Sequence, residues 1–239
     1  MNLVRYADRP DLLEVRYEQL TKPAFPEFMF HNQSGERYWG RLYDEHADFQ
    51  LALLNGDELA ADLHSLPIAW DGTDEDLPAG WDESFERAFE SGREPTVLSA
   101  VVITVSPARR GQRLSGRMIE AMRDAARAHG LGTLLAPVRP TLKARYPLIA
   151  IEEFVRWRRP DGSHLDPWIR THERVGGEIL RPAPESMVIE APVADWEEWT
   201  GLQLPGDGSY VVEGMLSMLE VRRGIGRHVE PNVWLRHAV

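Results

Sequence analysis

The hydrophobic pattern in the first third of the chain predicts a short helix followed by a β-hairpin. In residues 11–20 apolar side chains recur at helical spacing, and Asp11 stands where a helix N-cap belongs. Two apolar runs, at about 48–54 and 58–66, flank Asn55-Gly56, a dipeptide that strongly favours a tight hairpin turn. We therefore expect two adjacent antiparallel strands after an N-terminal helix.

The middle of the chain predicts a buried strand between two helices. Trp81 and Phe85 belong to one face of a first helix, which Gly92 can close. The run Val97–Val105 is too rich in β-branched residues for a good helix and too uniformly apolar for an edge strand, so we expect a central strand. The second helix ends at Gly130, and its apolar face is formed by Leu114, Met118, Ala121, Met122 and Ala125.

The remaining segments predict further strands and helices in alternation. Thr133–Val138 has the composition of a short buried strand. Helices are expected in "YPLIAIEEFVRW", with Pro147 in its first turn, and from Pro167 onward, with Asp166 as N-cap. Further strands are expected in "GEIL" and "SMVIEAPV", and near residues 209–221 and 228–236. This order of elements predicts a mixed α/β fold.

Composition narrows the class of protein. The formal charge of -11 over 239 residues disfavours a nucleic-acid binder, and the absence of cysteine excludes disulfides and thiol nucleophiles. No signal peptide or membrane-spanning stretch is recognisable, so we expect a soluble, cytoplasmic protein without a membrane partner. The acidic stretch 71–94 predicts a solvated outer helix face, with an acidic binding surface as the alternative.

The junction between the central strand and the next helix, "VSPARRGQRLSGRMIEAM", has the character of an anion site. A helix that starts directly after a buried strand leaves backbone N–H groups unpaired, and its dipole adds positive charge there. Gly111 permits close backbone approach, and Arg109, Arg110 and Arg113 add charge. Neither the P-loop nor the dinucleotide glycine pattern is present. A bound pyrophosphate is one reading, and a solvated basic helix start is the other.

The same junction resembles the pyrophosphate loop of the GNAT acyltransferase superfamily. That loop reads Arg or Gln, two variable residues, Gly, one variable residue, then Gly or Ala; Arg110, Gly111, Gln112, Arg113, Leu114 and Ser115 occupy these places. Arg113 and Ser115 depart from the usual residues. The order of elements from about residue 40 to 191 is also similar to that family. The chain further resembles an actinobacterial GNAT-like subgroup that ends in "EPNVW", here Glu230 to Trp234.

This resemblance implies a fold, a domain division and a co-substrate. The expected fold is a GNAT-like, mostly antiparallel twisted sheet flanked by helices. Residues 1–193 would form the acyltransferase domain, and residues 194–239 a β-rich C-terminal extension packed on it. Acetyl-CoA or another acyl-CoA would bind as co-substrate, with its pantetheine arm paired to backbone near Ile103 and Val105.

The resemblance also implies where catalytic groups should lie. Family enzymes often use a Tyr near the helix after the second splayed strand as proton donor, which makes Tyr146 a candidate; packing beside Pro147 is its alternative role. Candidate bases are Glu152, Glu153, Asp166 and His172, for which a surface ion pair, a helix cap or helix packing are the alternatives. His164 and His172 are too isolated to indicate a metal site. Core packing or an aromatic pocket would explain Trp157, Trp168, Trp196, Trp199 and Trp234.

The expected function is that of an acyl-CoA-dependent N-acyltransferase, most simply an acetyltransferase. The acceptor would be a small amine or amino-acid-like metabolite that attacks the thioester directly, and the protein could form a homodimer. One alternative keeps the fold with lyase or decarboxylase chemistry. Another is a binding protein without catalysis.

Overall fold

The computed structural model describes all 239 residues and contains one nine-stranded sheet. Eight strands follow the order β1-β2-β3-β4-β5-β9-β8-β7, and β6 pairs with β9 outside this path. Only the β4–β5 pair is parallel. The strands are β1 (Asn2–Arg5), β2 (Gln50–Asn55), β3 (Glu58–Ile68), β4 (Val97–Val105), β5 (Thr133–Val138), β6 (Glu178–Pro192), β7 (Gly208–Tyr210), β8 (Leu219–Arg222) and β9 (Ile225–Ala238). The expected mixed α/β fold with a mostly antiparallel sheet is confirmed.

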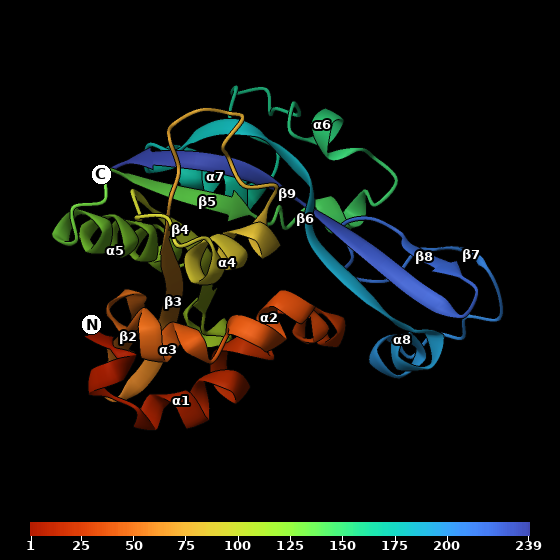
Figure 1. Cartoon of the computed structure of the whole chain (residues 1–239), viewed down its shortest axis with the longest axis horizontal. Coiled ribbons are helices and arrows are strands. Elements are labelled where there is room, and N and C mark those ends of the chain that lie inside the picture. Colours follow the sequence, from red (N-terminus) through yellow and green to blue (C-terminus); the bar gives the residue numbers. More distant parts are fainter.

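Eight α-helices surround this sheet (Figure 1). They are α1 (Asp11–Arg16), α2 (Gln33–Tyr38), α3 (Arg41–Glu45), α4 (Trp81–Glu90), α5 (Leu114–Ala128), α6 (Ile151–Phe154), α7 (Pro167–Arg174) and α8 (Val193–Thr200). Helix α1 continues directly into a π-helical turn, Tyr17–Thr21. None of the helices is long and apolar enough to cross a lipid bilayer.

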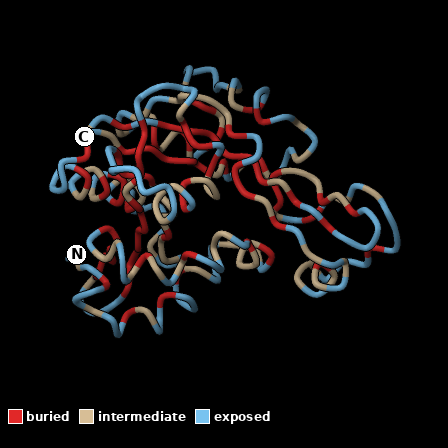
Figure 2. The backbone as a smooth tube through the Cα atoms, viewed as in Figure 1, coloured by how far each residue is buried: buried red, intermediate tan, exposed pale blue.

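The sheet separates two hydrophobic layers. Neighbouring residues of a strand point to opposite faces, so Leu98 packs in the cluster of α5 while Val97 packs in the cluster of α4. The second cluster also contains Tyr38 of α2 and Leu42 of α3. Figure 2 shows that buried positions concentrate along the strands between these layers. Helix α5 therefore covers one face of the sheet, and α2, α3 and α4 cover the other.

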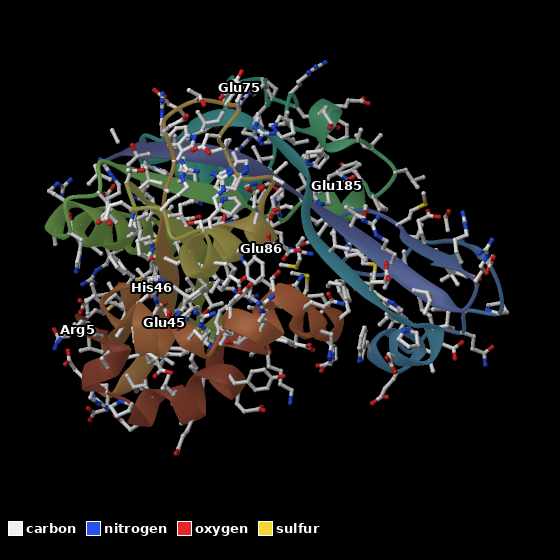
Figure 3. All side chains as sticks on the ribbon, in the orientation of Figure 1. Arg5, Glu45, His46, Glu75, Glu86 and Glu185 are labelled. Carbon is white, nitrogen blue, oxygen red and sulfur yellow. The ribbon has the colours of Figure 1, made fainter.

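The acidic stretch lies largely at the surface, as its charge pattern predicts. In Figure 3 the labelled Glu75 and Glu86 come from this stretch, and both are exposed. Asp82 is different, because it accepts hydrogen bonds from the Val188 N–H at 2.9 Å and the Asn32 amide at 3.0 Å. Burial raises the pKa of Asp82 to about 6.

Strands β6 and β9 form a long ribbon that leaves the sheet and carries β7, β8 and α8 at its far end (Figure 1). The other half of β9 pairs with β5, from Thr133↔Ala238 to Val138↔Val233. The predicted extension thus divides in two: residues 233–238 pair with β5 in the central sheet, whereas α8, β7, β8 and the first half of β9 lie in the outlying part. A third apolar cluster, centred on Trp196, holds that outlying part together.

Three local predictions differ from the structure. The strand expected near residues 209–221 is two short strands, β7 and β8, separated by a loop. The helix expected from Tyr146 begins only at Ile151, because the preceding residues are held in a turn by Lys143, whose ammonium donates to the carbonyls of Tyr146 at 2.9 Å and Leu216 at 2.5 Å. The two strands expected in "GEIL" and "SMVIEAPV" are one strand, β6, with a register irregularity between Ala183 and Met187. A bulge of this kind bends a strand without ending it.

Candidate active site

Strands β4 and β5 separate soon after they meet. They pair only through Leu98↔Leu134 and Ser99↔Leu135, although β4 continues to Val105 and β5 to Val138. Beyond this point the only strand that pairs with β5 is β9, and the only strand that pairs with β4 is β3. The facing backbone groups of the two strands are therefore left open over several residues, which creates a place for an extended ligand to pair with backbone.

A β-bulge in β4 lies at the start of this opening. The pairing with β3 passes from Ser65↔Ala100 to His64↔Val102, so Val101 is the additional residue. The carbonyl of Val101 accepts a hydrogen bond at 3.0 Å from the indole Nε1 of Trp81 at the start of α4. This contact satisfies the polar group that the bulge removes from the ladder, and it ties the strand to the helix layer.

A cavity of about 870 Å³ occupies the opening between the strands. Ligand pockets in proteins commonly measure about 300–1,000 Å³, so a small molecule and part of a coenzyme fit this volume. The cavity contacts both faces of the sheet. Its walls include Arg16, Tyr17, Thr21, Trp39 and Trp81 on the side of α2 and α4, and Arg110, Ser115, Trp168, Thr171 and His172 on the side of α5.

The loop before α5 adopts the conformation that a close anion contact needs. Gly111 and Arg113 both have left-handed backbones, with φ of 81° and 59°. Arg113 thus takes the backbone conformation that normally selects glycine at this place. The amides of Gly111 and Arg113 donate to no backbone carbonyl, and those of the first helical turn have no intrahelical partner. These donors fit a phosphate group.

The residues predicted to bind coenzyme A divide into two groups. Ile103, Val105, Arg110 and Ser115 line the cavity. Gly111, Gln112 and Arg113 are exposed, and Leu114 is buried in the cluster beneath α5. The Arg113 side chain therefore points to solvent and does not fill the cavity.

Of the predicted catalytic side chains, His172 is the one that lines the cavity. It lies on α7 and is buried, and its Nδ1 is 2.9 Å from Nε2 of His237 on β9. Burial lowers the pKa of His172 to about 3, with a contribution from His237. Its Nε2 has no hydrogen-bond partner in the protein. A neutral imidazole with one free ring nitrogen thus stands at the cavity wall.

The other predicted catalytic residues lie elsewhere. Asp166 is buried and caps α7, accepting from the amides of Trp168 at 2.8 Å, Ile169 at 3.0 Å and Leu142 at 2.6 Å. Tyr146 packs edge-on against Trp157 outside the cavity, at a ring distance of 4.9 Å. Glu152 and Glu153 are exposed on α6. Asp166 therefore caps a helix and Tyr146 packs against a neighbouring ring, which are the alternative roles that the sequence offered for them. The two glutamates are in solvent.

A buried ionic network at the cavity wall is absent from the sequence prediction. Asp62 of β3 accepts from Arg16 Nε at 2.9 Å, from the Tyr6 hydroxyl at 3.1 Å and from Thr104, and lies 3.2 Å from His64 Nε2. Burial alone would raise the pKa of Asp62, but the hydrogen bond from His64 and the charge of Arg16 hold it below its usual range.

A second ionic cluster lies at the far end of β5. Glu230 is buried, receives hydrogen bonds from the Arg139 guanidinium, and is 3.0 Å from His228 Nε2. Burial opposes its ionisation, yet Arg139 and His228 lower the pKa of Glu230. Arg139 and Glu230 both line the cavity. Glu230 is the first residue of the "EPNVW" motif of the sequence.

The chain matches no family model. It is 32% identical, in an alignment 269 positions long, to the arginine N-acetyltransferase avaD of Aspergillus versicolor, covering 98% of this chain and 92% of that protein. Among solved structures, the loading GNATL domain of CurA from Lyngbya majuscula has a TM-score of 0.60 at 17% identity, covering 99% and 96% of the two chains.

A second solved structure, the GNAT-like decarboxylase GphF in complex with isobutyryl-CoA, has a TM-score of 0.59 at 14% identity and covers 100% of this chain and 99% of that one. At such identities these two structures establish the fold alone. The full-length relationship to avaD goes further, because it joins the whole chain to an acetyltransferase. The chain therefore belongs to the GNAT superfamily, as one of its acyl-CoA N-acetyltransferases.

Proposed function

We propose that this enzyme transfers the acetyl group of acetyl-CoA to the primary amine of a small, arginine-like molecule. The observation that carries the proposal is the separation of β4 from β5 around a cavity that begins beside an unpaired helix start. The relative avaD is an arginine N-acetyltransferase, which supports the class of acceptor.

Acetyl-CoA is expected to lie with its pantetheine arm along β4 between Ala100 and Val105. The open backbone of β4 can pair with the amide groups of that arm as a neighbouring strand would. The pyrophosphate would contact the amides near Gly111 and the guanidinium of Arg110, which lines the cavity. This placement brings the thioester to the point where the two strands part.

The α-amine is the nucleophile of an arginine-like acceptor. A guanidinium stays protonated at neutral pH and has no lone pair to offer, whereas an α-amine loses its proton in mildly basic solution. Glu36 lines the cavity and gives its wall a carboxylate that can pair with the guanidinium of such an acceptor. The reaction rate should accordingly rise with pH as the neutral amine becomes more abundant.

In the transfer step the amine nitrogen forms a bond to the carbonyl carbon of the thioester, and the carbon–sulfur bond breaks. The nitrogen loses a proton and the departing sulfur gains one, so coenzyme A leaves as the free thiol. We assign to His172 a hydrogen bond to the departing sulfur. When His237 donates from Nε2 to His172 Nδ1, the neutral His172 ring carries its own hydrogen on Nε2, the atom without a protein partner.

The test is a product analysis with acetyl-CoA and L-arginine, followed by mass spectrometry and a thiol assay. Equal amounts of Nα-acetylarginine and free coenzyme A are expected. Malonyl-CoA in place of acetyl-CoA examines the decarboxylase alternative, because loss of carbon dioxide without amine acylation would identify that chemistry. Absence of acetylated product from L-arginine and from other small primary amines would refute the proposal.

A further inference from the structure

The cavity holds a buried guanidinium with hydrogen-bonding capacity to spare. The Arg16 side chain is only 7% exposed, and its Nε donates to Asp62 at 2.9 Å. Its Nη2 is buried and has no partner, although Arg16 lines the cavity. A buried donor without an acceptor is costly, so such a group is expected to meet an acceptor supplied from the cavity.

The position of this guanidinium is fixed from several sides. The guanidinium carbon Cζ of Arg16 lies 5.3 Å from the ring centre of Trp39. Its partner Asp62 is itself held by hydrogen bonds from Tyr6 and Thr104. Asp62 already accepts several hydrogen bonds, so Arg16 cannot turn Nη2 toward it without giving up other contacts of the network. The donor is therefore held in place before any ligand arrives, which lowers the entropy lost on binding.

A second unpartnered donor lies one π-helical turn further along the chain. The Thr21 hydroxyl is buried, has no hydrogen-bond partner and belongs to a residue that lines the same cavity. The turn Tyr17–Thr21 is π-helical, and the Lys22 amide donates to the Tyr17 carbonyl at 2.9 Å. Because a π-turn closes between residues five apart, Arg16 and Thr21 come to nearly the same side of the chain.

The face of the sheet identifies the ligand that these donors meet. Asp62 pairs with Thr104 and bonds to its side chain, and this side of the strands is covered by the N-terminal helices. The loop that would hold the coenzyme phosphates begins α5, which covers the opposite face. An anionic group that reaches Arg16 and Thr21 therefore comes from the acceptor.

We infer that Arg16 and Thr21 bind the carboxylate of the acceptor, so that the enzyme selects free amino acids over the corresponding amines. This inference rests on the proposed function and specifies its acceptor. One carboxylate oxygen accepts from Arg16 Nη2 and the other from the Thr21 hydroxyl. Because the carboxylate is charged, both hydrogen bonds are stronger than those between neutral groups.

The experiment compares L-arginine with agmatine, which keeps the amine and the guanidinium and lacks the carboxylate. Wild type should have a kcat/KM at least about tenfold higher for L-arginine. Arg16→Lys keeps a cation beside Asp62 and removes the forked donor, and it should reduce the L-arginine to agmatine ratio by about tenfold or more. Thr21→Val should reduce the same ratio by about threefold to tenfold. Arg9→Lys, at an exposed pair with Asp11, is the matched control and should leave the ratio unchanged.

The dissociation constant of L-arginine, measured by calorimetry with coenzyme A present, is the second readout. It should rise about tenfold in Arg16→Lys, while coenzyme A binding reports that the variant is folded. Equal use of L-arginine and agmatine by wild type, an unchanged ratio in both variants, or no binding of L-arginine to wild type would each overturn the inference. If wild type binds L-arginine through Arg16 but transfers no acetyl group, the proposed function fails and the carboxylate site stands.

Discussion

His172 and His237 form a buried imidazole pair, with Nδ1 of the first 2.9 Å from Nε2 of the second. The pair joins α7 to the end of β9, and one of its members lines the cavity. Burial lowers the pKa of His237 to about 4, and the charge of Arg123 acts in the same direction. Both rings are thus neutral at physiological pH, which suits a hydrogen-bonding role better than that of a cationic acid.

The first prediction concerns stability against pH. The two histidines titrate near 3 and 4 in the folded protein and near their ordinary value of 6.5 when unfolded. Below 6.5 the unfolded chain therefore binds more protons, and the free energy of unfolding falls as the pH drops. The slope is at most about 1.4 kcal/mol per pH unit for each ring.

Urea denaturation between pH 7 and pH 5 measures this slope, and His237→Gln should make it less steep than in wild type. Asp82 contributes with the opposite sign between its unfolded value of 3.8 and about 6, and it is common to both proteins, so the difference isolates the histidine. Parallel curves for the two proteins would show that His237 is not held neutral.

The second prediction tests the assigned role of His172. His172→Phe keeps a packed ring and removes the Nε2 donor, so kcat should fall about a hundredfold while the dissociation constant of acetyl-CoA changes by less than about threefold. Steady-state kinetics and calorimetry provide the two numbers. A matched control is Tyr146→Phe, at a residue outside the cavity, which should keep kcat near the wild-type value. A large loss in Tyr146→Phe with none in His172→Phe would reverse the two assignments.

The third prediction concerns the glycine that makes room for the imidazole pair. A Cβ at Gly177 would lie 2.7 Å from Cε1 of His237 and 2.8 Å from the carbonyl oxygen of His172. Gly177→Ala should therefore destabilise the protein by about 1–3 kcal/mol, because a backbone atom cannot easily move away. Gly132→Ala, where nothing lies within 4 Å, should change stability by less than about 0.5 kcal/mol. Thermal unfolding of the two variants compares them, and equal midpoints would contradict this packing.

The fourth prediction separates the two arginines of the phosphate loop. Arg113 has a left-handed backbone and an exposed side chain, so Arg113→Gly should keep or raise stability and leave coenzyme A affinity within about threefold. Arg110→Ala should weaken coenzyme A about tenfold or more, since it removes a cation from the cavity wall. Calorimetric titration with coenzyme A gives both values. A large loss in Arg113→Gly would mean that its side chain turns inward on binding.

Features encoded by neighbouring residues could be predicted from the sequence. Asn55-Gly56 fixes the hairpin turn, and Asp166 before Pro167 fixes the start of α7, because turn and cap chemistry act within a few positions. The loop before α5 was found for the same reason. Of its two unusual residues, Arg113 adopts a left-handed backbone at an exposed site, where its side chain meets no steric barrier.

Features that depend on distant pairing could not be predicted in this way. Arg16 meets Asp62 across 46 positions, and His172 meets His237 across 65. Nothing in the local pattern of either residue specifies its partner. The place of β9 next to β5 is likewise set by pairing between distant parts of the chain. The local pattern of residues 194–239 predicts only an extension packed on the domain.

The most direct test of the central claim is a crystal structure with acetyl-CoA bound. The pantetheine arm is expected to run along β4 between Ala100 and Val105, with the pyrophosphate at the amides near Gly111 and the thioester facing His172. Acetyl-CoA bound outside the opening between β4 and β5, or absent from crystals soaked to saturation, would contradict the account.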